Sequence, residues 1–375
     1  MAGIYVHIPF CKKRCSYCDF HFSTTFSTYR EKLIAAICLE LELRQSEVSG
    51  ELIQTIYFGG GTPSLLTRSE LGSILEVIHR NYNVIEFPEV TFEVNPDDAT
   101  IENLQDWKSL GINRLSIGLQ SFQSSDLSWM NRSHSIEQGI LAIKRAQELG
   151  FDNISIDLIY GLPDLSNEQW RSHLQQAIDL QVQHISSYCL TIEPKTALHH
   201  FVAKGKLHRP SEDQQSEQFE LLVKTLANNG FEQYEISNFA KEDCYAKHNS
   251  AYWNFTPYLG VGPSAHSFNG EQRRWNVANN TKYYQGVGKN QSWFELEVLT
   301  VSEKWNEYFL TGLRTKWGIE KKKLQEMGGL TDQEKVQMES YLSDQWIQET
   351  SEAFILTEKG KWQADGMASS FFRVN

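Results

Sequence analysis

Three cysteines near the start of the chain have the spacing of an iron–sulfur site. Cys11, Cys15 and Cys18 form a C-x₃-C-x₂-C pattern in the run PFCKKRCSYCDF, which holds half of the six cysteines. Three thiolates at this spacing can hold one [4Fe–4S] cluster and leave one iron free to bind a small molecule. A structural zinc site needs a fourth ligand, and His21 keeps that alternative open. Three unrelated buried cysteines are a poorer explanation, because the Lys and Arg residues of this segment would favour thiolates.

A glycine-rich segment follows the second apolar run of the chain. Gly60, Gly61 and Thr62 belong to the run GGGTP, where glycines let the backbone approach a ligand. A tight turn between strand and helix is the simpler explanation of such a run when it stands alone.

Two carboxylates lie in or beside apolar segments. Glu93 stands in FEVNP and Asp157 in SIDLIYGLP, and a carboxylate is costly to bury unless it is paired or binds a ligand. Ribose hydroxyls are one such ligand. Gln120 ends another apolar run, and Arg132 after it could meet a carboxylate through two hydrogen bonds. Each residue alone could line a barrel in a salt bridge, but together they favour a binding site.

The elements that must position these residues alternate along the first 230 residues. Apolar runs at 3–8, 52–58, 89–94, 113–119, 153–159 and 184–190 are separated by helical patterns of period 3.6. Gly111, Gly150 and Gly230 stand where helices should end. Such alternation demands parallel strands with right-handed crossovers. Six units predict an α/β fold with an open or partial (β/α)₆ barrel, a flat doubly wound sheet being the alternative. Either geometry puts the site at the C-terminal ends of the strands.

Details at both ends of this pattern are also predicted. The first helix should open near Thr28 with a capping box to Glu31. After residue 230 the runs EQYEISNFA and YLGVGPSAHSF read as strands or loops that extend or cover the barrel. From Glu303 short helices follow, and AFILTEKGKW should form a small hairpin. We therefore predict a barrel over 1–230, an extension over 231–300 and a mainly helical, winged-helix-like domain over 301–375.

Composition limits the classes of partner and compartment. The chain has 375 residues, 40% hydrophobic and 22% charged, with a net charge of −12. An acidic chain is a poor nucleic-acid binder, because phosphates attract a basic face. No run approaches the roughly 18 apolar residues of a transmembrane segment, and the chain starts without a signal-peptide pattern. A cluster-forming triad beside scattered Cys38, Cys189 and Cys244 predicts a cytoplasmic protein.

The motifs taken together resemble a known family. YVHIPFCxxxCxYCxF, FGGGTPSLL, EVNP, RLSIGLQSF, IDLIYGLP and HNxxYW are similar to those of the oxygen-independent coproporphyrinogen III oxidase family of radical S-adenosylmethionine (SAM) proteins, from residue 3 to beyond 270. The resemblance implies a [4Fe–4S] cluster on Cys11, Cys15 and Cys18, with SAM bound to it and cleaved to a 5′-deoxyadenosyl radical. It places SAM binding on Tyr5, Tyr17, Gly60, Gly61, Thr62, Glu93, Gln120, Arg132 and Asp157.

Two branches of that family differ in function. The oxidases have a further cysteine two residues after the third ligand, where this chain has Phe20, and an N-terminal extension, where only ten residues precede Cys11. Both departures match the heme-chaperone branch, which also carries HNxxYW. This motif is implied to handle heme through His248, Tyr252 and Trp253.

The residues of HNxxYW suit that role. Imidazole can ligate heme iron, and aromatic rings can pack on a flat macrocycle. We expect the motif, which lies beyond the sixth unit, to cover the barrel mouth near the cluster. A lone histidine beside aromatic residues is otherwise more often structural. His266, His21 and Cys244 are weaker candidates for the same role.

The sequence thus predicts a heme chaperone that binds a [4Fe–4S] cluster, SAM and heme and passes heme to an acceptor apoprotein. It would not be a coproporphyrinogen oxidase, and its acceptor could be membrane-bound and reached by peripheral contact. One alternative is a true oxidase that converts propionates to vinyl groups by radical decarboxylation. Another is a radical SAM enzyme acting on a different tetrapyrrole.

Overall fold

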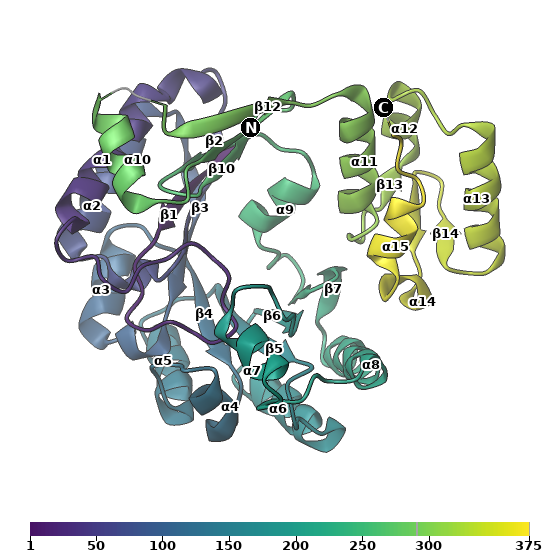
Figure 1. Cartoon of the computed structure of the whole chain (residues 1–375), viewed down its shortest axis with the longest axis horizontal. Coiled ribbons are helices and arrows are strands. Elements are labelled where there is room, and N and C mark those ends of the chain that lie inside the picture. The colour runs from purple at the N-terminus through teal and green to yellow at the C-terminus, as the bar shows by residue number, and fades with distance from the viewer. Residues whose placement is uncertain (290–291, 375) are drawn as a thin grey trace.

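Six parallel strands form the centre of the molecule. The computed structural model describes residues 1–289 and 292–374 (Figure 1). The six are β1 (Ala2–Ile8), β2 (Ile53–Gly60), β3 (Val84–Val94), β4 (Arg114–Gln120), β5 (Ile154–Tyr160) and β6 (His184–Cys189). They are neighbours in chain order within a twelve-stranded sheet whose edges are β12 and β7. The predicted runs are therefore confirmed, and the sheet is an open, partial barrel.

Helices cover the outer face of these strands (Figure 1). They are α1 (Arg30–Leu43), α2 (Arg68–Asn81), α3 (Ile101–Ser109), α5 (Ile136–Glu148), α6 (Asn167–Asp179) and α8 (Glu212–Asn228). Two short helices, α4 (Ser124–Trp129) and α7 (Ala197–Ala203), follow β4 and β6, and short 3₁₀ helices lie at Gln45–Val48, Pro63–Leu65 and Pro96–Asp98. Gly111, Gly150 and Gly230 have φ angles of 92°, 77° and 79°. This left-handed conformation ends the helices before them, as predicted.

Helix α1 begins two residues after the predicted Thr28, and the predicted capping box is wrong. The residue before the helix is Tyr29, and no side chain caps the first turn. The Tyr29 hydroxyl accepts a hydrogen bond from Asn280 Nδ2 at 3.0 Å, and the Arg30 guanidinium binds the Glu70 carboxylate at 2.6 Å. These tertiary contacts, rather than a local capping box at Thr28, set the helix start.

The two faces of the parallel sheet differ in chemistry. Ile4, Val6 and Phe58 are fully buried in the core beneath the helices. Alternate positions such as Tyr5 and Glu93 point into the concave side, because successive side chains of a strand face opposite ways. The concave face is therefore rich in polar groups that need partners or ligands.

The segment after α8 adds strands to both edges of the sheet. β7 (Glu232–Glu235) and β8 (Asn238–Ala240) form a hairpin that pairs antiparallel to β6. β9 (Tyr258–Val261) pairs parallel to β1, and β10 (His266–Phe268), β11 (Gln272–Asn276) and β12 (Phe294–Val298) continue antiparallel. α9 (Lys247–Trp253) lies between the two edges in sequence, and α10 (Asn280–Lys289) packs against α1. Both runs expected to extend or cover the barrel thus extend the sheet.

A buried carboxylate ties this extension to α1. Glu40 is fully buried and accepts hydrogen bonds from Arg44 at 2.8 Å, from the Tyr283 hydroxyl at 2.6 Å and from Asn276 at 2.8 Å. A buried charge with several donors is well compensated. The Glu40 network therefore holds α10 and β11 in place beside α1.

The C-terminal region has its own core. It contains α11 (Val301–Gly312), β13 (Ile319–Glu320), α12 (Lys321–Glu326), α13 (Asp332–Ser343), β14 (Ile347–Glu349), β15 (Ala353–Leu356), α14 (Glu358–Lys361) and α15 (Ala364–Ser369). Trp305, Phe309 and Phe371 are at its centre. The helices pack with a three-stranded antiparallel sheet. The residue boundaries proposed for the three regions stay a prediction.

The predicted C-terminal hairpin is displaced in the structure. The sequence AFIL forms β15, but its hairpin partner is β14, which precedes it. The following TEKGK segment is the helix α14, because Thr357 accepts a hydrogen bond from the Gly360 N–H and starts a helical turn.

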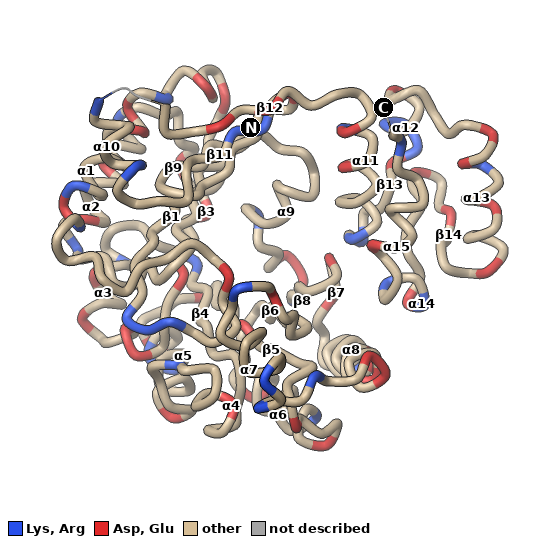
Figure 2. The backbone as a smooth tube through the Cα atoms, in the orientation of Figure 1, with Lys and Arg blue, Asp and Glu red and all other residues tan. Residues whose placement is uncertain are grey.

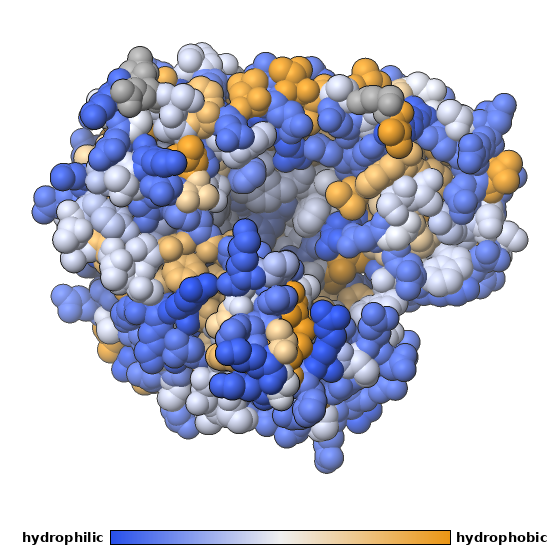
Figure 3. Space-filling view, in the orientation of Figure 1, coloured by the Kyte–Doolittle hydropathy of each residue, from blue (hydrophilic) through white to orange (hydrophobic). Residues whose placement is uncertain are grey.

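The distribution of charge, the shape of one face and the character of the helices describe the molecule as a whole. Lys and Arg residues are scattered over all parts of the tube in Figure 2. The space-filling view shows a face that is hollowed between the sheet and the C-terminal region (Figure 3). Within the described ranges, no helix combines the length and apolar character needed to cross a bilayer.

Candidate functional site

The cysteine loop follows the C-terminal end of β1 and is held by backbone hydrogen bonds to distant segments. The Cys11 N–H donates to the Ser23 carbonyl at 3.1 Å, and the Ser16 N–H donates to the Met130 carbonyl at 3.0 Å. The Ser16 carbonyl in turn accepts from the Leu198 N–H at 2.8 Å. The loop is therefore shaped by the protein itself, and Cys11, Cys15 and Cys18 are free, partly buried thiols.

Two hydrogen-bond donors from other loops reach these sulfurs. Thr62 Oγ1 donates to Cys11 Sγ and an Arg132 guanidinium N–H donates to Cys15 Sγ, both at 3.5 Å. Donors of this kind stabilise sulfur that carries negative charge and orient it toward a metal.

Burial of the cysteine loop opposes the charged form of two of its thiols. Burial raises the pKa of Cys11 to about 11 and that of Cys18 to about 12. The Lys12 ammonium does not turn toward the sulfurs, because it binds Asp97 at 2.8 Å and also Asp98. Desolvation therefore outweighs the positive charge of the segment.

The donor set fits a cluster better than a zinc ion. Across residues 1–289 and 292–374, no three His, Cys, Asp or Glu side chains are close enough together to hold one metal ion. His21, the fourth ligand that zinc would need, instead shares a hydrogen bond of 2.7 Å with Asn280 Oδ1. Soft sulfur donors of this kind suit an iron–sulfur cluster.

The glycines after β2 are required by close backbone approach. Gly60 has a φ of +107°, and a Cβ there would lie 2.5 Å from the His7 ring. A Cβ on Gly61 would lie 2.7 Å from the Phe10 carbonyl oxygen. The Gly60 N–H donates to Glu93 Oε2 at 3.1 Å. The GGGTP run is thus more than a tight turn, since it packs directly on β1 and contacts Glu93.

Two carboxylates on the concave face have perturbed protonation. Burial raises the pKa of Glu93 to about 7, although the Tyr57 hydroxyl donates to it at 2.8 Å. Burial also raises the pKa of Asp157 to about 6, and the Ser116 hydroxyl lies 3.4 Å from its Oδ1. Among the residues that the structure describes, neither carboxylate forms a salt bridge, which was the alternative to a ligand-binding role.

Arg132 connects the carboxylate side of the site with the cysteine loop. Its guanidinium donates to Asn95 Oδ1 at 2.9 Å and to the Gly118 carbonyl at 2.8 Å, besides Cys15. Its Nε is buried without a partner among the described residues. Gln120, at the end of β4, has a φ of 73° that turns the chain sharply toward this point. A Cβ on Gly118 would lie 2.9 Å from the Gln120 amide and 3.0 Å from Arg132.

The remaining predicted SAM residues border the same space. The Tyr5 ring stacks on Tyr57 with centroids 5.9 Å apart, and its hydroxyl lies 3.3 Å from His7 Nδ1. Burial raises the pKa of Tyr17, whose surroundings include Arg132 and Asp157. The structure therefore brings the predicted SAM positions together at one end of the strands. Sequence reasoning missed Asn95 and Ser116, although both are polar residues in or beside buried strands.

His248 lies inside the protein rather than at its surface. The side chain is 1% exposed, with Nδ1 2.8 Å from the Thr55 hydroxyl and Nε2 2.9 Å from the Tyr252 hydroxyl. Its ring stacks on Tyr57 at 5.1 Å. Burial lowers the pKa of His248 to about 3, so the imidazole is neutral at physiological pH.

The expected position of HNxxYW near the cluster is wrong. His248 contacts Thr55 and lies beside Gly3, in the first halves of β2 and β1, whereas the cysteine loop follows the end of β1. The reason is topological. β9 runs parallel to β1, so the chain must return to the N-terminal ends of the strands before it enters β9, and α9 lies on this return.

The other heme candidates have different surroundings. The Arg314 guanidinium lies over the Trp253 ring at 5.6 Å, and Tyr252 packs edge-on against Tyr258 at 4.5 Å. His266 is exposed and stacks on Trp275 at 6.2 Å. Cys244 is a partly buried free thiol. The described residues show no contact of His266 or Cys244 with His248, whereas Tyr252 is hydrogen-bonded to it.

Comparison with known proteins identifies the family. Residues 5–177 match the model of the Radical SAM superfamily. The chain is 34% identical to the heme chaperone HemW of Bacillus subtilis, over 88% of this chain and 87% of that protein. It is 31% identical to the heme chaperone HemW of Mycobacterium tuberculosis, over 97% of this chain and 93% of that one.

A solved structure shares the fold. Coproporphyrinogen III oxidase (HemN) from Escherichia coli superimposes with a TM-score of 0.85 at 23% identity, over 99% of this chain and 90% of that chain. Structural likeness at this identity shows a common fold, while the sequence relatives match over nearly their whole lengths. This chain belongs to the HemW family of radical SAM proteins.

Proposed function

We propose that this protein is a heme chaperone that holds a [4Fe–4S] cluster on Cys11, Cys15 and Cys18, binds SAM beside it, and transfers heme to an acceptor protein. One observation supports the proposed binding of the cluster and SAM. Three free thiols, two hydrogen-bond donors to sulfur and two carboxylates of raised pKa converge at the same end of the parallel strands. The names of the relatives support the heme part.

Each side chain has a role in this proposal. A bound cluster supplies an electron and an open iron for SAM. Arg132 orients Cys15 and meets the SAM carboxylate, using donor capacity that the described residues leave unfilled. Glu93 and Asp157 accept hydrogen bonds from hydroxyl or amino groups, because both are desolvated carboxyls that pair with no cation in the described part of the chain. Gly60, Gly61 and Thr62 admit the ligand close to the backbone, and Tyr5, Tyr17 and Gln120 complete the walls.

The cofactor proposal is tested by anaerobic reconstitution. We expect about four irons per chain and the brown absorbance of a [4Fe–4S] cluster. Cys15→Ala should abolish the cluster, because two thiolates do not hold it. Cys38→Ala, which removes a partly buried cysteine on α1, is the matched control and should retain it. Stoichiometric zinc without acid-labile sulfide would refute the proposal.

For heme, we propose that His248, Tyr252 and Trp253 form the handling site. Both ring nitrogens of His248 are hydrogen-bonded, so ligation of iron requires the Tyr252 hydroxyl to leave Nε2. Tyr252→Phe should therefore ease ligation, whereas His248→Ala should change the Soret band and leave cluster content and SAM binding intact. A heme titration with iron–sulfur absorbance recorded on the same sample tests this. An unchanged Soret band in His248→Ala would contradict a ligand role.

A second candidate function, the oxidase, is favoured only by the fold shared with HemN. Phe20 is 67% exposed on the cysteine loop, at the position where the oxidases carry a further cysteine. We expect no conversion of coproporphyrinogen III with reductant and excess SAM, and none in Phe20→Cys. Parallel assays of heme binding and decarboxylation on one preparation separate the two functions. Stoichiometric divinyl product from the wild type would overturn the chaperone proposal.

A further inference from the structure

The last strand of the twelve-stranded sheet has an open edge. β12 pairs antiparallel with β11, and no strand in the described part of the chain lies beyond it. In this ladder the Leu299 N–H donates to the Glu271 carbonyl at 3.0 Å. Because hydrogen-bonded pairs occur at every second position of an antiparallel ladder, Glu295 and Glu297 turn their backbone groups toward β11. The N–H and C=O groups of the residue between them, Leu296, therefore face the open edge.

The residues whose backbone faces this edge have exposed apolar side chains. Leu296 is 50% exposed and Val298 is 61% exposed. Val301, which follows at the start of α11, is 76% exposed. Apolar surface is visible in Figure 3 along the upper rim, where Figure 1 places β12 and its link to α11. An exposed apolar edge of this kind accepts a further strand through main-chain hydrogen bonds.

Two glutamates alternate with the apolar residues of β12. Glu295 and Glu297 are exposed. Arg273, which faces Glu297 across the ladder, binds Glu307 instead at 2.7 Å, and Trp275, which faces Glu295, carries no charge. Both carboxylates are therefore free of an ion pair among the described residues. Opposite charges on a facing strand would stabilise the pairing.

A second copy of this chain does not suit the edge. If β12 paired with its own copy across a twofold axis, Leu296 would face Leu296 and each Glu295 would face a Glu297. Like charges directly opposite each other destabilise a sheet. The net charge of −12 also opposes contact with another copy or with an anionic lipid surface. The pattern favours a different protein, with a segment in which basic and apolar residues alternate.

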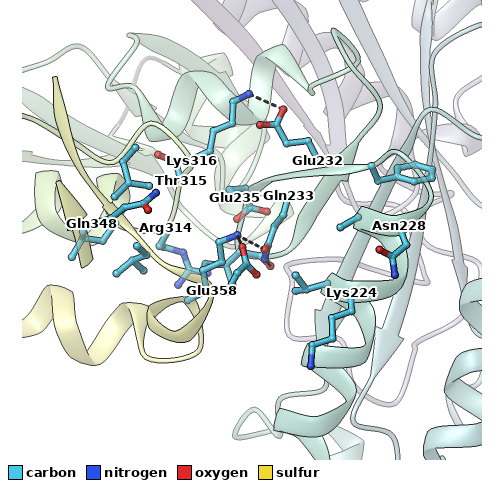
Figure 4. Close-up of a pocket in the computed structure, with 18 of the residues that line it drawn as sticks. Lys224, Asn228, Glu232, Gln233, Glu235, Arg314, Thr315, Lys316, Gln348 and Glu358 are labelled. Atoms are coloured by element: carbon cyan, nitrogen blue, oxygen red, sulfur yellow. Dashed lines mark hydrogen bonds and ion pairs between the residues drawn. The ribbon is translucent and has the colours of Figure 1, made fainter. Parts of the chain in front are cut away.

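The protein itself holds this edge strand in place. β11 fixes one side of it, and the chain after it enters α11 of the C-terminal region. That region is anchored to β7 around a cavity, where Lys316 binds Glu232 at 2.8 Å and Lys361 donates to the Gln233 side chain at 2.8 Å (Figure 4). A strand that is already ordered loses little conformational freedom when a partner pairs with it.

The edge belongs to the same part of the sheet as the proposed heme residues. Tyr252 of α9 packs edge-on against Tyr258 of β9 with ring centroids 4.5 Å apart, and β9, β10, β11 and β12 are neighbours in that order. Three strand spacings of about 4.8 Å, roughly 14 Å in all, separate β12 from β9. A protein docked at β12 is therefore close enough to receive a ligand from α9.

We propose that β12 is the docking strand for the heme acceptor, which adds to the open edge an extended segment of alternating basic and apolar residues. Main-chain hydrogen bonds to Leu296 and Val298 hold the segment, and its cations face Glu295 and Glu297. That the docked partner accepts heme rests on the proposed chaperone function. The docking strand adds a location and a chemistry of recognition to that function.

Three labelled peptides test the docking strand on the reconstituted full chain. KVKIKVK alternates basic and apolar residues, KKVIVKK has the same composition without the alternation, and EVEIEVE carries the opposite charge. Fluorescence anisotropy measures their affinities. KVKIKVK should bind at least about tenfold more tightly than either of the others, because it alone matches both the ladder and the carboxylates.

Variants of β12 separate strand pairing from side-chain contact. Leu296→Pro removes an N–H that faces the open edge, where proline is tolerated, and should weaken KVKIKVK at least about tenfold. Leu296→Thr keeps that N–H and a side chain suited to strands, so this matched control should weaken binding less than about threefold. Glu295→Lys combined with Glu297→Lys should reverse the preference, so that EVEIEVE binds best. The same change at the exposed Glu102 and Glu339 should keep the wild-type preference.

A transfer assay links the strand to heme delivery. Apomyoglobin carrying KVKIKVK on a flexible linker should take heme from the loaded chain at least about threefold faster than apomyoglobin carrying KKVIVKK, because docking raises its effective concentration. Leu296→Pro should abolish that difference. Equal rates for the two fusions with the wild type would show that a protein docked at β12 is not placed to receive heme, and would overturn the proposal.

The outcomes separate the docking strand from the proposed function. Circular dichroism and cluster absorbance check that each variant is folded. Equal affinity of the wild type for KVKIKVK and KKVIVKK would overturn the docking strand and leave the heme function standing. Equal weakening in Leu296→Pro and Leu296→Thr would also overturn it, because it would show side-chain contact without strand pairing. Failure of the wild type to bind heme in a titration of the same preparation would contradict the chaperone function instead.

Discussion

Arg132 is the residue that joins the parts of the proposed cofactor site. One planar group contacts a cysteine sulfur, a loop amide and a strand carbonyl, and its fork geometry permits all three contacts at once. A lysine carries the same charge but presents one compact ammonium. Charge alone is therefore insufficient at this position.

We predict that Arg132→Lys weakens SAM binding by about 2 kcal/mol, or roughly thirtyfold, while the cluster is retained. Equilibrium dialysis with SAM on reconstituted protein measures the affinity, and iron analysis of the same sample measures the cluster. Arg80→Lys is the control, because Arg80 is exposed and pairs with Glu42 on the protein surface. Unchanged SAM affinity in Arg132→Lys would remove this residue from the SAM site.

His173 is a buried histidine whose lowered pKa predicts a pH-dependent effect on stability. It is 2% exposed on α6, packs against Phe122 and Trp170 with ring centroids 5.9 and 6.1 Å away, and has no partner for Nδ1 among the described residues. Burial lowers its pKa to about 4. Below the unfolded pKa of about 6.5, the unfolded chain binds the proton first. This residue therefore contributes a loss of stability as the pH falls.

We predict that His173→Leu reduces the loss of unfolding free energy between pH 7 and pH 5 by about 2 kcal/mol. Leucine takes up no proton in either state, so the linkage disappears. Urea unfolding at the two pH values measures the difference. The exposed His208 provides the control, since His208→Leu should keep the pH dependence of the wild type. The prediction fails if His173→Leu and the wild type lose equal stability.

The residue types at the proposed cofactor site were predictable, because charged side chains are rare in apolar strands and indicate a binding site. Glu93 and Asp157 stand out in sequence for this reason, and Cys15 stands out by its spacing from two other cysteines. The protonation of the thiols was not predictable, because local charge in the sequence does not reveal burial or the turn of Lys12 toward Asp97.

At the scale of elements, α9 depends on a carboxylate from another strand. The helix has seven residues, and its own first turn has no side-chain cap. Glu89 of β3, 6% exposed, accepts the N–H groups of Lys247 and His248 at 3.0 Å each. A negative charge at a helix N-terminus is favourable, and these donors would otherwise be unsatisfied.

We predict that Glu89→Ala destabilises the protein by about 2 kcal/mol and increases hydrogen exchange across 247–253. Glu89→Gln should have a smaller effect, because its amide oxygen still accepts one hydrogen bond. Glu86→Ala, at an exposed position of the same strand, controls for loss of a strand glutamate. Unaltered exchange in α9 of Glu89→Ala would show that packing alone holds this helix.

Elements with strong periodicity were predictable, and their tertiary placement was not. The six parallel strands follow from apolar runs and terminal glycines. The start of α1 and the end of the barrel reached by α9 depend on residues distant in sequence, such as Asn280 for Tyr29 and β1 for β9. Local patterns carry no information on such contacts.

At the scale of the whole molecule, two apolar cores meet across limited contacts. One core lies between the sheet and its helices, and the other lies among α11, α15 and the small sheet. Backbone links between them include the Lys316 N–H donating to the Tyr234 carbonyl at 3.0 Å and a bridge between Glu235 and Thr315. Parts joined in this way can unfold separately.

We predict that Phe309→Ala lowers the stability of the C-terminal region by about 3–5 kcal/mol and leaves the barrel nearly unchanged. Phe309 is fully buried and stacks on Phe371 at 4.6 Å, so its removal leaves a cavity in the second core. Urea unfolding of reconstituted protein is followed by cluster absorbance for the barrel and by hydrogen exchange of α11 and α15 for the C-terminal region. Phe92→Ala, equally buried but in the first core, should shift the cluster signal instead. Equal shifts of both signals in both variants would show that the two cores unfold as one unit.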